Sequence, residues 1–158
     1  MEGDGYLLLG NGGHARVIKD LIEKLGGSVV YVFNDDTEYD PCFEPGLPLI
    51  VAIGNNTFRK KVVEKVKHTM PVLVHPSAQL ATDVVPEEGT IILANAVIQA
   101  GAKIGKHCLI NANVVIDHEV QVGDFVTIYP NVYIGGAAMI TDLITIDPGT
   151  IVDRMQKV

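Results

Sequence analysis

The chain of 158 residues carries a formal net charge of −7, and 47% of its residues are hydrophobic whereas only 6% are aromatic. This length suits one ordinary domain or two small ones. The acidic balance argues against a nucleic acid partner, because affinity for DNA or RNA depends on cationic side chains that neutralise phosphates. The two cysteines, Cys42 and Cys108, form no CxxC motif, and the first apolar run is too short for a signal peptide or a membrane span. We therefore expect a soluble, cytoplasmic protein that holds no metal ion and binds neither nucleic acid nor membrane.

The first seventy residues alternate between strand and helix patterns. In chain order we expect a strand over 6–9, a helix over 15–24, strands over 28–33 and 49–53, and a helix over 57–67. The apolar residues Val17, Ile18, Leu21, Ile22 and Leu25 give the first helix its 3.6-residue spacing. The segment 37–48 carries three prolines and is expected to be an irregular connection. Alternating strands and helices predict a small α/β domain with a parallel sheet.

A glycine turn follows the first strand. Residues 10–15, GNGGHA, fit the pattern G-x-G-x-x-G/A, in which backbone amides and a helix N-terminus favour a pyrophosphate. The acidic residues after the second strand suit hydrogen bonds to a ribose or a base. The alternative is that the glycines serve only a tight turn and the acids only a solvated loop, and His14 either contacts phosphate or caps the turn. The candidate binding residues are Gly12, Gly13, His14, Asp35, Asp36, Gly54, Asn55 and Arg59.

From about Val72 the helical period gives way to a six-residue period. One set of positions at this spacing is always β-branched and apolar: Ile92, Ile98, Ile104, Ile110, Ile116, Val122, Ile128, Ile134, Ile140, Ile146 and Val152. A second set, four residues after each, is small or β-branched: Ala96, Ala102, Cys108, Val114, Val120, Val126, Val132, Ala138, Ile144 and Thr150. We expect both sets to face inward, with Cys108 a core residue and not a nucleophile.

A hexapeptide repeat winds the chain into a triangular coil with three hexads per turn, a parallel β-helix. From Leu80 to Val152 the hexads make about four coils, and Pro86 alone breaks the apolar rule in that span. Glycine and asparagine tolerate the positive φ that corners require. The candidate corner residues are Gly101, Gly105, Asn111, Asn113, Gly123, Asn131 and Gly135.

These motifs together resemble the PglD/NeuD-type sugar acetyltransferases. The resemblance rests on LLLGNGGHARVIKDLI, VFNDD, VAIGNNTFRKKV, VHPSA and INANVVIDHEVQVGDF, and it covers nearly the whole chain. It implies a Rossmann-like nucleotide-sugar-binding domain over 1–73 and a left-handed β-helix acyltransferase domain over 74–158. It also implies acetyl-CoA as the donor, and as acceptor an amine on a nucleotide-linked amino sugar or, in one branch, a hydroxyl of sialic acid.

Acetyl transfer needs a base for the attacking group and a donor for the oxyanion. His118 is the candidate base, because it lies two places after inward-facing Ile116 and should project from the wall. Its neighbours in the coils below and above are Ala100 and Gly136, which would leave the imidazole in a notch. The alternative is that His118 is only a polar residue on an exposed face, as we expect for His107.

The resemblance assigns further roles around this base. It implies a catalytic pair of His118 and Glu119, a polar partner at Asn111, and a Gly136 amide facing the acyl-CoA carbonyl. Asp117, on the other side of the histidine, is expected to support it. Relatives often carry a second histidine where this chain has Thr127, so a polarising role at that position is expected to be weakened or absent. Relatives also have more coils than the hexads up to Val152 make, which predicts either weaker coenzyme binding or a site partly rebuilt by a neighbouring subunit.

The leading hypothesis is therefore an acetyl-CoA-dependent N-acetyltransferase that acts on a nucleotide-linked amino sugar and forms a homotrimer, with clefts between its subunits. One alternative is O-acetylation of sialic acid or a related sugar, since a hydroxyl and an amine need the same base. Another is a non-catalytic trimeric protein that binds nucleotide sugars and has lost its coenzyme site. A dehydrogenase is disfavoured, because about 70 residues before the hexads are too few for a full dinucleotide fold.

Overall fold

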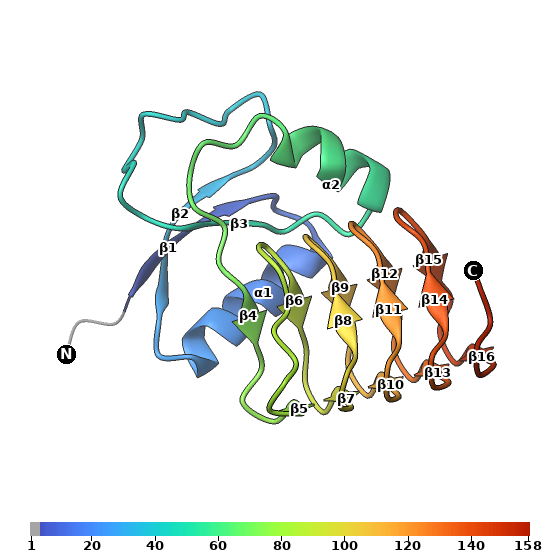
Figure 1. The fold of residues 1–158 in the computed structure, drawn as a ribbon. Helices are drawn as coiled ribbons and strands as arrows, with labels where there is room; N and C mark the ends of the chain where they lie inside the picture. The colour runs from blue at the N-terminus through green and yellow to red at the C-terminus, as the bar shows by residue number, and fades with distance from the viewer. Residues whose placement is uncertain (1–3) are drawn as a thin grey trace. The chain divides into compact units, whose positions relative to one another are not determined.

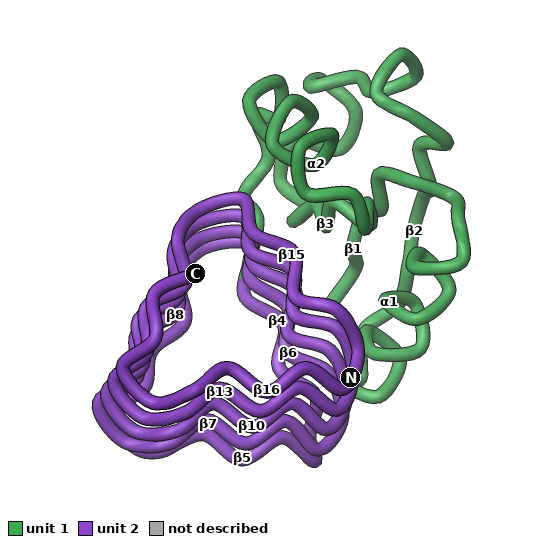
Figure 2. Tube along the Cα trace, turned by 90° about the vertical axis from the view of Figure 1, so that its right-hand side faces the viewer, with its two compact units in different colours: residues 1–71 green, residues 72–158 purple. Residues whose placement is uncertain are grey.

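The computed structural model describes residues 4–158. The chain divides into two compact units, over residues 1–71 and 72–158 (Figure 2). The first is an α/β unit and the second is a parallel β-helix, so the fold class predicted from the sequence is confirmed.

The first unit is built on a three-stranded parallel sheet in the order β2-β1-β3 (Figure 1). Its elements are β1 (Gly5–Leu9), α1 (Gly13–Lys24), β2 (Ser28–Phe33), β3 (Leu49–Val51) and α2 (Asn56–Val63). The third strand ends two residues earlier than expected. Helix α2 ends at Val63 and not near Lys67, because the amides of Lys65 and Val66 bond the carbonyls three residues before them and close a tighter turn.

Helix α1 packs one face against the sheet and ends where the backbone reverses. Ile18, Leu21 and Ile22 are buried, but Val17 and Leu25 are 44% and 41% exposed. Val17 and Leu25 therefore lie at the edges of the apolar stripe, and the three residues between them face the sheet. The helix stops before Gly26, whose φ of +84° suits a residue without a Cβ.

The connection 37–48 is irregular, as expected, and side chains fasten it to the rest of its unit. The Tyr39 hydroxyl lies 2.9 Å from His68 Nδ1, and His68 Nε2 lies 3.0 Å from the Phe43 carbonyl oxygen. The Tyr39 ring also packs edge-on against Phe33, with ring centroids 5.6 Å apart. A buried histidine thus joins two points of a segment that forms neither helix nor strand.

The second unit is a coil of two-residue strands that form three parallel sheets around a triangular interior (Figure 2). Two sheets have five strands, in the orders β16-β13-β10-β7-β5 and β15-β12-β9-β6-β4, and one has three, β14-β11-β8. The strands are β4 (Leu73–Val74), β5 (Gln79–Leu80), β6 (Ile91–Ile92), β7 (Val97–Ile98), β8 (Lys103–Ile104), β9 (Leu109–Ile110), β10 (Val115–Ile116), β11 (Gln121–Val122), β12 (Thr127–Ile128), β13 (Tyr133–Ile134), β14 (Met139–Ile140), β15 (Thr145–Ile146) and β16 (Ile151–Val152).

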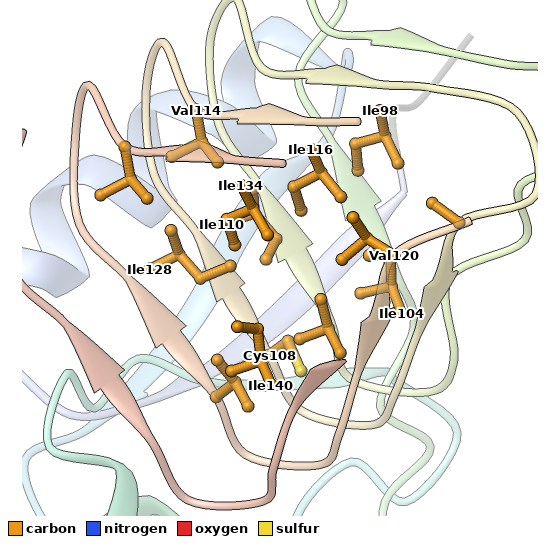
Figure 3. Close-up of a cluster of buried hydrophobic side chains, with 14 of the residues drawn as sticks. Ile98, Ile104, Cys108, Ile110, Val114, Ile116, Val120, Ile128, Ile134 and Ile140 are labelled. Atoms are coloured by element: carbon orange, nitrogen blue, oxygen red, sulfur yellow. The ribbon is translucent and has the colours of Figure 1, made fainter. Parts of the chain in front are cut away.

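The interior is the aliphatic lining that the period predicts. Every residue of the first inward set is buried, with exposures from 0% at Ile92 to 5% at Val122. The second set is buried through Ala138 and half-buried at Ile144 and Thr150. Figure 3 shows these side chains pointing toward one another, with the Cys108 thiol among them. Cys108 is fully buried, as expected of a core residue.

The corners turn through one residue in the left-handed region, and these residues recur at the same place in successive coils. The expectation holds for Gly101, Asn113 and Asn131, whose φ values are 76°, 59° and 61°. It was wrong for Gly105, Asn111, Gly123 and Gly135, none of which has a positive φ. At Gly123 close approach explains the glycine, because a Cβ there would lie 2.3 Å from the Asp142 carboxylate.

His107 occupies one of these left-handed positions, with a φ of 53°. It was expected on an exposed face but is only 6% exposed. Its ring stacks on Phe125 in the next coil, with centroids 5.0 Å apart, and lies over Gly89 in the coil before. The glycine and the aromatic ring above it account for the burial.

The repeat extends beyond both ends of the span read from the sequence. Val74 pairs in register with Ile92, so the coil begins at β4 and not at Leu80. At the other end, Val158 keeps the six-residue register and packs against the core, and Lys157 forms a bridge with Met139. Pro86 interrupts the register: no strand forms there, since proline lacks an amide to donate.

Candidate functional site

His118 lies at a corner of the coil between β10 and β11. Inward-facing Ile116 is fully buried and fixes the register on one side, and Glu119 makes the turn with a φ of 59°. The His118 side chain is 45% exposed as a result. The prediction that this imidazole projects from the wall of the coil agrees with the structure.

Glu119 is the acid that contacts the ring. Its Oε2 lies 3.3 Å from His118 Nδ1, and its side chain is 71% exposed. When Nδ1 donates a hydrogen bond to this carboxylate, Nε2 is the ring nitrogen that keeps a free lone pair.

Gly136, in the next coil, lies directly against the imidazole. A Cβ placed there would be 2.7 Å from His118 Nε2 and 2.9 Å from Cε1. Gly136 is buried. The ring therefore occupies the room that the missing side chain leaves, and any larger residue at this position would displace it.

Asp117 holds the backbone of His118 rather than its ring. Its Oδ1 accepts a hydrogen bond of 2.7 Å from the His118 amide, and its Oδ2 accepts one of 3.0 Å from the Tyr133 hydroxyl. The bond from the His118 amide, followed by that from Tyr133, lowers the pKa of Asp117 below its ordinary value. The Gly136 amide also donates toward this carboxylate, with the smallest effect on that pKa. In this structure the expected oxyanion donor thus faces Asp117.

Two other residues singled out from the sequence lie apart from His118. Asn111 follows β9 and His118 follows β10, so they occupy the two corners that bound one face of the coil. The Asn111 side chain donates to the Ile128 carbonyl at 2.8 Å. Thr127 is 3% exposed within β12. A single copy of the chain does not bring Asn111 or Thr127 to the imidazole.

The face that follows the His118 corner is hollowed. A depression of about 530 Å³ covers the sheet formed by β8, β11 and β14. The side chains of Lys103, Gln121, Met139, Thr141 and Asp142 line it. The depression is open and mixes apolar surface with one cationic and one acidic side chain, as suits an extended and partly polar ligand.

The α/β unit holds a second pocket, of about 340 Å³, at the carboxyl ends of its strands. Five predicted residues line it: Gly12, Gly13, His14, Asp35 and Gly54. Gly10 and Asn11 of the predicted glycine turn also line it, as do four residues that the sequence interpretation missed: Asn34, Ala52, Ile53 and Phe58. Among these, Asn11 Nδ2 donates to Asn34 Oδ1 at 2.9 Å, and Phe58 is 44% exposed on the first turn of α2. The pattern of a strand followed by a polar residue, as at Asn34, was the available signal.

The glycines of this turn are there for different physical reasons. Gly10 is required by the fold, because its φ is 116° and a Cβ would lie 2.9 Å from the Ala52 carbonyl oxygen. A Cβ at Gly12 or Gly13 would meet nothing within 4 Å. No side chain caps α1, and its first turn has no acidic residue. The unfilled space and the uncapped amides of α1 face the same pocket, which is the arrangement that binds an anion.

His14 contributes a neutral imidazole to this pocket. Burial, and then the positive charge of Arg59, lower the pKa of His14 from 6.5 to about 4. Its Nε2 is buried and, among residues 4–158, has no hydrogen-bond partner. A buried polar atom without a partner costs free energy, and a ligand that pairs with it would recover that cost.

The remaining predicted residues of this unit have structural tasks. Asp36 forms an ion pair with Lys65, and Asn55 caps α2 by accepting from the Phe58 amide at 2.8 Å. Arg59 is 2% exposed and donates to the carbonyls of Ile53 and Gly54, both at 2.9 Å. These three residues shape the turn beside the pocket without lining it.

Within 4–158, no group of three or more histidine, cysteine or acidic side chains is placed to hold a metal ion. In the same part of the chain, no helix combines the length and apolar character needed to cross a membrane.

Comparison with known protein families matches both units. The model described as the PglD N-terminal domain matches residues 6–66, and that for the bacterial transferase hexapeptide (six repeats) matches residues 87–118. The fold and these matches define a hexapeptide-repeat protein that carries an additional α/β unit.

Similar proteins narrow the class further. The chain is 32% identical over 109 residues to UDP-N-acetylbacillosamine N-acetyltransferase of Bacillus subtilis (strain 168), a match that covers 55% of this chain and 50% of that protein. The chain thus spans about half the length of this relative. It also resembles a variant of perosamine N-acetyltransferase from Caulobacter crescentus, solved in complex with CoA and GDP-perosamine, with a TM-score of 0.79, 28% identity, and coverage of 98% of this chain and 88% of that chain.

The acetyltransferase domain of PglB from Neisseria gonorrhoeae, solved in complex with acetyl coenzyme A, shares the fold, with a TM-score of 0.76 at 22% identity and coverage of 99% of this chain and 96% of that chain. Residues 6–66 thus resemble the PglD N-terminal domain and residues 87–118 the transferase hexapeptide repeat, and the chain is similar to sugar N-acetyltransferases.

Proposed function

We propose that this protein transfers the acetyl group of acetyl-CoA directly to the amine of a nucleotide-linked amino sugar, with His118 as the general base. The observation that carries this proposal is the His118 corner, where a half-exposed imidazole contacts Glu119 through Nδ1 and leaves Nε2 over a glycine. The relative from Bacillus subtilis and the neighbour from Caulobacter crescentus are both named as sugar N-acetyltransferases, which favours an amine over a hydroxyl as the acceptor.

The reaction follows from the chemistry of these groups. As the sugar nitrogen attacks the thioester carbonyl and the N–C bond forms, His118 Nε2 accepts the proton that the nitrogen loses. Glu119 stabilises the resulting imidazolium. The carbonyl oxygen gains negative charge, and a donation from the Gly136 amide would stabilise it. When the C–S bond breaks, the coenzyme thiolate takes the proton from the imidazolium, so that the base is restored.

The α/β unit supplies the nucleotide subsite in this proposal. A diphosphate on the amides of Gly12 and Gly13 would use the open space beside them and the helix N-terminus of α1. The exposed ring of Phe58 offers a stacking surface for the base. Asp35 Oδ1 is occupied by the amide and hydroxyl of Thr37, so Oδ2 is the atom that would accept from the base or the ribose.

We also propose a homotrimer. The outward residues on the face of β7, β10, β13 and β16 are Val97, Val115, Tyr133 and Ile151, and Ile151 is 70% exposed. Apolar positions on a flat face favour packing against another copy. Asn111 lies at the far edge of this face from His118, so another copy would have to supply it to the site. The two free cysteines, Cys42 and Cys108, suit a reducing compartment such as the cytoplasm.

The test is turnover of the purified chain with acetyl-CoA and a panel of UDP- and GDP-linked amino sugars, followed by release of the coenzyme thiol. We expect His118→Ala to lose on the order of 10² to 10⁴ in kcat. Lys106→Ala is the matched control, because Lys106 is exposed at the same place in its hexad at another corner, and it should keep wild-type turnover.

Full activity of His118→Ala would overturn the assignment of the base. Acetylation of a sugar hydroxyl in place of the amine would move the protein to O-acetyl transfer. Absence of any heat when millimolar coenzyme A is titrated into the wild type would favour a protein that only binds nucleotide sugars.

A further inference from the structure

Tyr133 is an unusual residue within its own column of the repeat. The outward positions of the β5-β7-β10-β13-β16 face are Gln79, Val97, Val115, Tyr133 and Ile151, and Tyr133 carries the single hydroxyl among them. It pairs with Val115 across parallel strands, one coil after the strand that leads to His118. Its side chain therefore lies one coil beyond Val115 and reaches the carboxylate of Asp117, the residue before His118.

The Tyr133 hydroxyl is the first member of a hydrogen-bonded chain that ends on the backbone of the base. It donates to Asp117 Oδ2 at 3.0 Å, and Asp117 Oδ1 accepts from the His118 amide at 2.7 Å. Each carboxylate oxygen therefore has its own donor. A carboxylate held at both oxygens keeps one rotamer, whereas one held at a single oxygen can rotate about its side-chain bonds.

We propose that Tyr133 is a positioning residue for acetyl transfer, which acts through Asp117 to hold the His118 corner in its reactive geometry. The inference rests on the proposed function, because it needs His118 to be the base. It adds a residue that the G-x-G turn, the hexad pattern and the His-Glu pair do not include.

The His118 ring has few other constraints. Glu119 contacts Nδ1 at 3.3 Å, a long distance for a hydrogen bond, and its side chain is 71% exposed. The ring orientation therefore depends on the backbone from which it projects. A hydrogen-bonded His118 amide fixes that backbone, and the Asp117 carboxylate that accepts from this amide is itself fixed by Tyr133.

The Tyr133 hydroxyl also competes with the Gly136 amide for the Asp117 carboxylate, which accepts hydrogen bonds from both. Both of these bonds lower the pKa of Asp117. Without the hydroxyl, the Asp117 carboxylate would keep the His118 and Gly136 amides as its donors and would hold the Gly136 amide more closely. That amide is the one that the proposed reaction needs for the oxyanion, so losing the hydroxyl should slow the chemical step more than it weakens binding.

The experiment is a double-mutant cycle with Tyr133→Phe and Asp117→Asn, measured by steady-state turnover. Tyr133→Phe keeps the ring and removes one oxygen. We expect about a five- to tenfold fall in kcat, with KM for both substrates within twofold of the wild type. Asp117→Asn should cost at least as much, and the double variant no more than Asp117→Asn alone, because the two residues act in series.

Tyr129→Phe is the matched control. Its side chain is 39% exposed against 41% for Tyr133, and among residues 4–158 its hydroxyl makes no hydrogen bond. It should leave kcat unchanged. The His118 amide resonance in a ¹⁵N-labelled sample should shift in Tyr133→Phe and stay in place in Tyr129→Phe, a readout that does not require turnover.

The outcomes separate this inference from the function on which it rests. If His118→Ala is inactive but Tyr133→Phe matches the wild type in kcat, the role of Tyr133 is overturned and the proposed function stands. Additive losses in the double variant also overturn it, since Tyr133 would then act without Asp117. If His118→Ala is fully active, the proposed function fails first. A lowered melting temperature in Tyr133→Phe with an unmoved His118 resonance would assign the tyrosine to stability alone and would falsify the proposal.

Discussion

The two units of this chain differ in how their functional residues can be recognised. In the β-helix every position has equivalents one coil away, so a residue can be compared with its own column. His118 follows Ala100 and precedes Gly136 in its column, and it stands out for this reason. The α/β unit offers no such reference, since each of its turns occurs once. A repeat therefore supplies an internal control from a single sequence, and a non-repeating unit needs its three-dimensional pocket before the binding residues can be separated from the structural ones.

The largest expected effect is the difference in stability lost when an inward or an outward isoleucine of the coil is replaced. Ile128 is fully buried in the interior, whereas Ile151 points outward and is 70% exposed. We expect Ile128→Ala to lower the free energy of unfolding by about 2 to 5 kcal/mol, because it leaves a cavity in a narrow core. Ile151→Ala removes the same atoms and should cost less than about 0.5 kcal/mol in the monomer. Urea denaturation of both variants checks the difference, and equal losses would contradict the assignment of faces.

The next effect belongs to the α/β unit and depends on pH. The pKa of His14 is lowered from 6.5 to about 4 in the folded protein. At a pH between about 4 and 6.5, the unfolded chain therefore binds a proton at this residue and the folded chain does not. Stability should therefore be unaffected by His14 above about pH 6.5 and should fall as the pH is lowered toward 4, by up to about 3 kcal/mol.

His14→Gln should remove this part of the pH dependence. The measurement is the difference between the unfolding free energies of wild type and variant at pH 7 and at pH 4.5. A difference that does not change with pH would mean that His14 is protonated with an ordinary pKa in the folded protein.

The smallest expected effect distinguishes a glycine needed for nucleotide binding, Gly12, from one needed for the fold, Gly10. A Cβ at Gly12 meets no atom of the chain, so Gly12→Ala should leave the melting temperature within about 1 °C of the wild type. It should weaken binding of UDP or GDP by about tenfold, since the methyl group occupies the space proposed for the diphosphate. Calorimetric titration of the nucleotide measures this. Gly10→Ala is the contrasting variant and should unfold at a lower temperature, because its backbone is strained for any other residue.

The fold of the coil could be predicted from the sequence because its cause is periodic. One aliphatic residue every six positions leaves few other solutions, and the inward sets and the buried Cys108 followed from it. The residues at the corners were harder to predict from the sequence. Glutamate at 119 and phenylalanine at 125 adopt the left-handed conformation that glycine and asparagine were expected to supply, because the repeat imposes it on whichever residue stands there.

The candidate site was predictable in its composition and less so in its contacts. His118, Glu119 and Gly136 are close together as expected, but the contact between Asp117 and Tyr133 joins residues sixteen positions apart and has no local signal. In the α/β unit, Arg59 and Asn55 matched the expected turn but serve the backbone, and Phe58 lines the pocket from a position that only the start of α2 determines. Side-chain partners of this kind depend on distances that spacing alone does not contain.

The eighteen-residue step of the coil has a consequence for how such proteins change over evolutionary time. Duplication or loss of one whole turn returns every later side chain to the same environment. The chain length can therefore change by eighteen residues without repacking of the core. An insertion of a single residue would instead reverse inside and outside for all that follows. Length polymorphism among natural variants of this β-helix should therefore be confined to multiples of the turn or to bulges at its corners.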